Sequence, residues 1–108
     1  MSTSLPKRRG PKPRTTTTNP HRQLDQNAPV ALQEVLWSRM AALPRVTIGP
    51  SRVSVPGARA VFIADAAKAS DKNCVMKANE FAHLHPPNDG SLHVALPEPV
   101  RMEALARG

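Results

Sequence analysis

The first long pattern of apolar and polar positions along the chain is helical. Between residues 29 and 43, apolar positions recur every three or four residues, which is the spacing of one helix face. Asn27 or Ala28 can cap such a helix, and Pro44 stops it. The expected apolar stripe consists of Leu32, Val35, Leu36, Met40 and Leu43. The pattern therefore predicts an amphipathic helix over residues 29–43, with Trp37 as a packing residue beside the stripe.

Shorter runs with a period of two follow this helix. Residues 46–48 and 53–55 alternate around a Gly-Pro turn signal, and residues 60–63 form a third apolar run. Residues 65–72 are rich in alanine and polar side chains, which indicates a loop or a short helix, and residues 97–107 predict a final helix. Together these elements predict one α+β domain, with an N-terminal helix packed on a small, mainly antiparallel sheet.

The segment that follows predicts a β-hairpin. Residues 86–90 separate two alternating runs and contain the Asp-Gly pair typical of hairpin loops. If His85 and Ser91 close the loop, the facing pairs are Leu84 with Leu92, His83 with His93, Ala82 with Val94, and Phe81 with Ala95. One face of the hairpin then carries only apolar side chains and is expected to face the core: Ala82, Leu84, Leu92, Val94 and Leu96. The opposite face carries His83, His85 and His93, and a slip of one residue would scatter both sets.

Three imidazoles on one face point to a metal site. Facing Cβ atoms lie ~5 Å apart and diagonal ones ~7 Å apart, so one ion is within reach of all three side chains. Neutral imidazole is the commonest protein ligand for metals, and three histidines with an open position suit zinc. With an added carboxylate, the set also suits iron or copper. Asp89 is a nearby acid, whereas Glu80 falls on the apolar face and needs a β-bulge to join.

Two other interpretations of the histidines stay open. They can be half-buried residues on a solvated sheet face, or one of them can act alone as a general acid or base. Cys74 has no partner for nucleophilic chemistry in the sequence and is expected to be a small buried apolar residue.

The charge of the chain is concentrated at its N-terminus. Of 15 Lys and Arg residues, six precede the first acid, Asp25, and the other nine are balanced by eight Asp and Glu, so the net charge of +7 divides into +6 and +1. Residues 1–26 are rich in Pro and Thr and are expected to be a disordered tail, with the domain spanning residues 27–108. Residues 7–14 could contact nucleic acid, but a solvated tail is favoured.

Length and cysteine content narrow the class of protein. A chain of 108 residues supports one small domain, and its single cysteine cannot form an internal disulfide, which favours a cytoplasmic protein. No apolar run reaches the ~20 residues of a membrane span. A small-molecule substrate is the partner expected of the histidine face.

Several segments together resemble the luciferase-like domain family. These are residues 80–86 (EFAHLHP), 89–93 (DGSLH) and 96–97, together with residues 13–24 and 53–60. The family includes the fungal luciferases, which oxidise a hydroxypyrone luciferin with oxygen and emit light, and many small bacterial proteins of unknown activity. The resemblance implies a possible oxidoreductase, with His83, His85 and His93 as the matching site positions.

The resemblance also implies an incomplete domain. Family members typically continue with a Gly-Trp segment bearing another His-Pro, then a strand and a helix, whereas this sequence ends at Gly108. A missing strand would expose a sheet edge and reduce the core. A non-catalytic binding module is therefore the alternative to an enzyme, next to a basic-tailed protein associated with nucleic acid.

Overall fold

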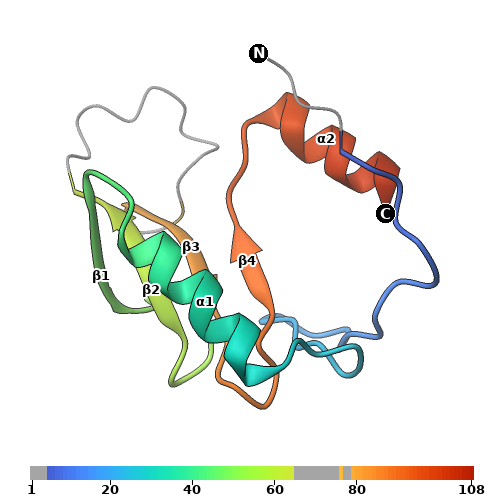
Figure 1. The fold of residues 1–108 in the computed structure, drawn as a ribbon, viewed down its shortest axis with the longest axis horizontal. Coiled ribbons are helices and arrows are strands. Elements are labelled where there is room, and N and C mark those ends of the chain that lie inside the picture. The colour runs from blue at the N-terminus through green and yellow to red at the C-terminus, as the bar shows by residue number, and fades with distance from the viewer. Residues whose placement is uncertain (1–4, 65–75, 77–78) are drawn as a thin grey trace.

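The described part of the chain folds around a four-stranded antiparallel sheet with one helix before it and one after it. The computed structural model describes residues 5–64, 76 and 79–108. The elements in chain order are α1 (Val30–Ala41), β1 (Val46–Pro50), β2 (Arg59–Ile63), β3 (Glu80–Leu84), β4 (Leu92–Val94) and α2 (Glu98–Arg107). The strands lie in the order β1-β2-β3-β4, each antiparallel to its neighbour (Figure 1). This arrangement confirms the predicted α+β class.

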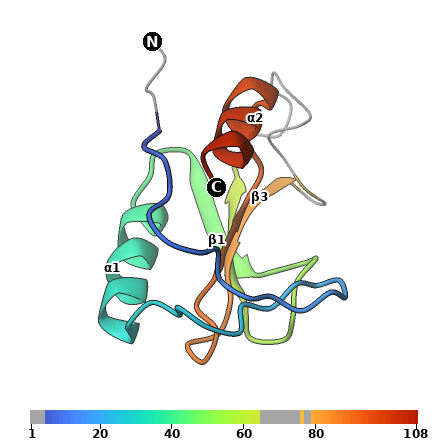
Figure 2. The same cartoon turned by 90° about the vertical axis from the view of Figure 1, so that its right-hand side faces the viewer.

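Helix α1 crosses one face of the sheet (Figures 1 and 2). The guanidinium of Arg59 on β2 lies 4.8 Å from the centre of the Trp37 ring and forms an ion pair of 3.0 Å with Glu34. Both contacts fasten the middle of the helix to the sheet, and Trp37 is a packing residue as predicted.

The predicted apolar stripe of α1 is only partly correct, since Leu36 and Met40 are half-buried but the other three residues are not. Leu32, Val35 and Leu43 are exposed, whereas the buried helix residue is Gln33, at 2% exposure. The side-chain amide of Gln33 donates hydrogen bonds to the carbonyls of Ala28 and Pro87, at 2.8 and 3.1 Å. Two acceptors thus turn a polar residue inward, because a buried amide is stable when its donors are satisfied.

The hairpin of β3 and β4 has the predicted register. Leu84 pairs with Leu92, His83 with His93 and Ala82 with Val94. The loop closes through a hydrogen bond of 2.9 Å from the His85 amide to the Ser91 carbonyl. The Ala95 amide continues the ladder by donating to the Phe81 carbonyl.

The expected division of this hairpin into a core face and a histidine face is only half right. Leu84 and Ala82 on β3 are buried, but Leu92 and Val94 on β4 are 42% and 41% exposed. Because β4 is an edge strand, it has a neighbour on one side only, and α1 covers the other part of the sheet. The buried apolar residues are consequently few and mostly small: Ala58, Ala60, Val61, Ala82 and Leu84.

Three further predictions from the sequence concern the chain between β1 and β3. Residues 53–55 are not a strand: the Ser51 hydroxyl accepts hydrogen bonds from the Val53 and Ser54 amides, which bends the chain into a loop. The loop or short helix expected over residues 65–72 and the buried role expected of Cys74 lie outside the described residues.

Helix α2 forms where the sequence predicts it, directly after Pro97. It lies apart from the sheet, against the start of the chain (Figure 1). The Arg8 amide donates to the Arg107 carbonyl at 2.8 Å, and the Leu5 amide donates to the Glu103 carboxylate. Among the described residues, no helix has the length and apolar content required to cross a membrane.

Candidate metal centre

The three predicted histidines come together on one face of the hairpin. His83 lies on β3, His85 follows the end of β3, and His93 lies on β4. One ring nitrogen from each lies within 4.8 Å of the corresponding nitrogens of the other two. The rings are nearly parallel, with centres 4.4 Å apart for His85 and His93, 4.9 Å for His83 and His93, and 5.5 Å for His83 and His85. His83 and His85 are buried, and His93 is half-buried.

Glu80 joins this cluster through a β-bulge. The register between β2 and β3 shifts by one residue, since Val61 faces Ala82 but Phe62 faces Glu80, leaving Phe81 without a partner on β2. The extra residue turns the Glu80 carboxylate toward the histidine face, where its Oε2 lies 2.8 Å from Nδ1 of His83. The sequence required a β-bulge for Glu80 to join the site, and the structure contains this bulge.

The Glu80 carboxylate is fully buried and receives hydrogen bonds from the loop after β1. The Ser51 hydroxyl donates to Oε2 and the Arg52 amide donates to Oε1, both at 2.7 Å. Together with His83, these donors occupy both carboxylate oxygens. The carboxylate is thus held in place and in turn fixes the orientation of the His83 ring.

Asp89 does for His85 what Glu80 does for His83. Its Oδ2 lies 2.7 Å from Nδ1 of His85 and also accepts a hydrogen bond of 3.3 Å from the Gln23 amide. Its Oδ1 accepts from the Ser91 amide at 3.1 Å. Burial works to raise the pKa of Asp89, but the hydrogen bonds from His85 and Ser91 outweigh it and hold the pKa below its usual value. Asp89 thus orients His85 in this structure, and its weaker expected role as a metal ligand stays a prediction.

These two carboxylates decide which nitrogens are available for chemistry. An ionised carboxylate only accepts hydrogen bonds, so Nδ1 of His83 and of His85 carries the proton in the neutral ring. Each Nε2 then has a free lone pair. Nε2 of His85 is buried and has no hydrogen-bond partner among the described residues, whereas Nε2 of His93 lies 3.3 Å from the Ser91 hydroxyl.

Burial favours the neutral form of two of the imidazoles, those of His83 and His93. Burial lowers the pKa of His93 to about 4, and the neighbouring His85 and His83 rings act in the same direction. Burial also lowers the pKa of His83, against the opposing effect of Glu80. Neutral imidazole is the form that binds metal ions or accepts protons, so the cluster is ready for either task at neutral pH.

The residues fit a metal ion once the three rings move closer together and rotate. Ligand nitrogens lie ~2.0–2.1 Å from zinc, which places two of them about 3.4 Å apart on a tetrahedral ion. The ring nitrogens lie up to 4.8 Å apart, so they must draw together by rather more than 1 Å. A lone pair lies in the plane of its ring, so binding also requires the stacked rings to rotate. The buried Nε2 of His85 without a partner favours such an occupant.

The sequence pattern identified the three ligand candidates and the two nearby acids, but it missed the pairing of each acid with one histidine and the roles of Gln23 and Asn27. The Glu80–His83 pair depends on a bulge, and the Asp89 carboxylate is fastened by Gln23, a residue that the sequence placed in a disordered tail. The Asn27 side chain also donates to the Asp89 carbonyl, at 2.6 Å. A three-residue spacing from Glu80 to His83 and a four-residue spacing from His85 to Asp89 were the only signals available.

A comparison with protein families finds a match that covers the hairpin and the helix after it. Residues 78–108, which contain β3, β4 and α2, match the Luciferase domain family. The match includes all three histidines and both orienting carboxylates, and it supports a luciferase-like domain in this part of the chain. Neither the curated proteins nor the solved structures provide a match to the chain.

Proposed function

We propose that His83, His85 and His93 bind one divalent transition-metal ion, and that this centre serves an oxygen-using oxidoreductase of the luciferase-like kind. The observation that carries the metal proposal is the buried Nε2 of His85, which has no hydrogen-bond partner in the described part of the chain and belongs to a group of three histidines with ring nitrogens within 4.8 Å of one another. The oxidoreductase class rests on the match of residues 78–108 to the Luciferase domain.

The surroundings of the histidines support metal binding over simple packing. Two of the three rings are oriented by buried carboxylates through Nδ1, which is the arrangement that raises the basicity of a ligating imidazole. Zinc, iron and copper all bind imidazole, and a bound ion of this kind would supply Lewis-acid or redox chemistry. The protein itself contributes the fixed tautomers, the neutral rings and the partial exclusion of water.

Metal titration of the purified full-length chain tests the proposal. We expect the wild-type protein to bind one Zn²⁺ or Co²⁺ per chain in equilibrium dialysis, and His85→Gln to weaken binding by at least about a hundredfold. His21→Gln is the matched control, because His21 is exposed and does not belong to the cluster.

Because His85 is buried, its variant needs a second one beside it. His93→Gln alters a half-buried ring on the edge strand and should also weaken binding, while circular dichroism verifies that both variants are folded. Binding that is absent from the wild-type protein, or equal in all folded variants, contradicts the metal proposal.

A second candidate function is general-base catalysis by His85. The Asp89 carboxylate holds Nδ1 of His85 at 2.7 Å and leaves Nε2 as the basic atom, which is how a carboxylate orients a catalytic imidazole. The same titration separates the two candidates, since a base needs no ion. A folded wild-type protein that binds no metal would favour this second function.

A further inference from the structure

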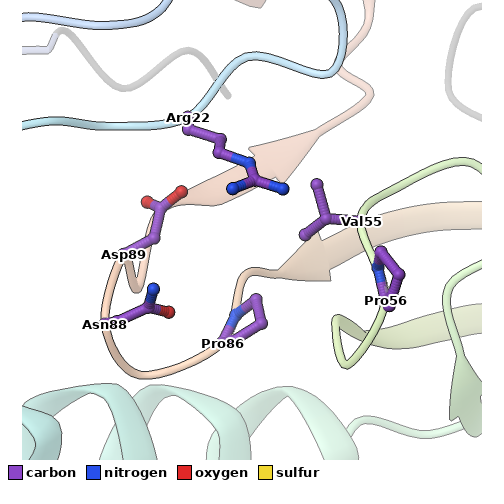
Figure 3. Close-up of a pocket in the computed structure, with 6 residues that line it drawn as sticks. All are labelled: Arg22, Val55, Pro56, Pro86, Asn88 and Asp89. Atoms are coloured by element: carbon purple, nitrogen blue, oxygen red, sulfur yellow. The ribbon is translucent and has the colours of Figure 1, made fainter.

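A small pocket beside the Asp89–His85 pair is lined by three segments that lie far apart in sequence (Figure 3). Its volume is about 150 Å³. One segment precedes α1, one is the loop between β1 and β2, and one is the hairpin loop. The lining residues are Arg22, Val55, Pro56, Pro86, Asn88 and Asp89.

Arg22 reaches over this pocket from an anchored backbone. Its amide donates to the Thr16 hydroxyl and its carbonyl accepts from the Thr16 amide, both at 2.9 Å. The guanidinium extends between Asp89 on one side and Val55 on the other in the view of Figure 3. It forms no hydrogen bond or ion pair within the part of the chain that the structure describes.

Arg22 and Asp89 are the two charged residues that line the pocket, and the guanidinium forms no ion pair with this carboxylate. Asp89 is the one acid among the lining residues, and its oxygens already accept hydrogen bonds from His85, Gln23 and Ser91. The carboxylate keeps its negative charge but directs its oxygens to these donors, so the Arg22 guanidinium is the group of the pocket that can attract a second oxyanion. A guanidinium offers a planar pair of donors that matches a carboxylate or another flat oxyanion.

The remaining walls set the size and shape of the ligand. Val55, Pro56 and Pro86 present apolar surface, and a cavity of ~150 Å³ accepts a single six-membered ring. The Asn88 side chain adds one polar group at the rim. A planar, single-ring molecule bearing one oxyanion matches the volume, the apolar walls and the guanidinium of this pocket.

We propose that this pocket binds the anionic group of a small aromatic or otherwise planar ligand, with Arg22 as its specificity-determining residue. The proposal rests on the proposed function in one respect: it places the ligand next to the His85–Asp89 pair as the substrate of that site. It makes the N-terminal segment, which supplies Arg22, a part of the binding site.

Benzoate and benzamide are suitable probes, because they share one ring and differ in charge. Each is titrated into the ¹⁵N-labelled full-length chain and followed by amide chemical shifts, with EDTA present so that no metal ion can bind the carboxylate. We expect saturable benzoate binding that shifts amides of the hairpin loop, and weaker binding of benzamide. Arg22→Gln should raise the Kd of benzoate about tenfold.

Arg9→Gln is the matched control, since it removes the same charge from the same segment at a position outside the pocket. It should leave the Kd of benzoate unchanged. The pocket proposal is overturned if the wild-type chain does not bind benzoate, if benzamide binds equally well, or if Arg22→Gln and Arg9→Gln have equal effects. Metal uptake in the dialysis experiment is measured separately, so either proposal can fail while the other stands.

Discussion

At the scale of single residues, burial lowers the pKa of two of the three histidines in the site, His83 and His93. His93 has the clearest perturbation, with a pKa lowered to about 4 by burial and by the adjacent rings. A proton on any one of the three would face two other imidazoles across 4.4–5.5 Å between ring centres. The cost of such a charge is the reason that the stability of the metal-free protein should depend on pH.

We expect the metal-free protein to lose about 1–2 kcal/mol of stability between pH 7 and pH 5. The folded pKa of His93, about 4, lies below its usual value of 6.5, so the unfolded chain binds more protons at intermediate pH. The contribution is therefore fully present above pH 6.5 and is lost as the pH falls toward 4. Urea midpoints in EDTA at both pH values measure the effect.

The matched variant for this measurement is His93→Gln, which cannot take up the proton. It should lose less stability than the wild-type protein over the same pH interval. Equal losses in the two proteins would show that other groups cause the pH dependence.

At the scale of elements, the hairpin loop is the part that fastens the site together. The amides of Asp89 and Gly90 both donate to the Pro86 carbonyl, at 2.9 and 2.8 Å, which makes a tight turn. Gly90 has a φ of +70°, a conformation that favours glycine. A Cβ at this position would overlap the buried Gln33 side chain, so the turn, the helix and the carboxylate of Asp89 depend on one small residue.

Gly90→Ala should therefore destabilise the protein by about 1–3 kcal/mol. The substitution adds both backbone strain and a clash with the Gln33 amide, which cannot withdraw without losing its two acceptors. Gly49→Ala is the control, because its Cβ would meet Phe62 at an ordinary 3.6 Å. Urea denaturation should show a change within about 0.5 kcal/mol for Gly49→Ala, and comparable losses in the two variants would contradict the argument.

The elements also show how far the sequence could predict this structure. The hairpin register followed from an alternation in which His83, His85 and His93 had to share a face, and the structure confirms it. The orientation of α1 did not follow, because the buried amide of Gln33 depends on the distant Pro87 carbonyl, a contact that no local periodicity encodes. The expected burial of Leu92 was wrong on similar grounds. Its exposure depends on the place of β4 at the edge of the sheet, which local alternation does not encode.

At the scale of the whole molecule, the segment before α1 belongs to the site. The expected disorder of residues 1–26 stays a prediction, but in the structure the segment holds one isolated bridge between Thr15 and Gln23, and the Gln23 amide donates to Asp89. Removing the segment that contains Gln23 would leave the Asp89 carboxylate with one hydrogen-bond donor fewer. The N-terminal segment thus contains both the basic residues 7–14 and Gln23, which helps to position the Asp89 carboxylate.

Two truncations separate these parts. Deleting residues 1–10 removes, among the described residues, exposed contacts of Leu5 and Arg8 with the C-terminal end of the chain, and it should change the free energy of unfolding by less than about 0.5 kcal/mol. Deleting residues 1–24 also removes the Gln23 donor and should destabilise the protein by about 1–3 kcal/mol. Urea midpoints of both truncated chains provide the measurement, and equal midpoints would show that the segment does not support the site.

The pairing of residues 5–8 with α2 has a consequence for the order in which the chain assembles. Contacts from Leu5 to Glu103 and from Arg8 to Gly108 span 98 and 100 residues, and both are exposed. Closing a loop of that length costs the most chain entropy, and an exposed contact returns the least burial. The two ends of the chain should therefore come together last during folding and separate first under stress, as one cooperative unit whose opening frees α2 while the sheet and its histidines stay folded.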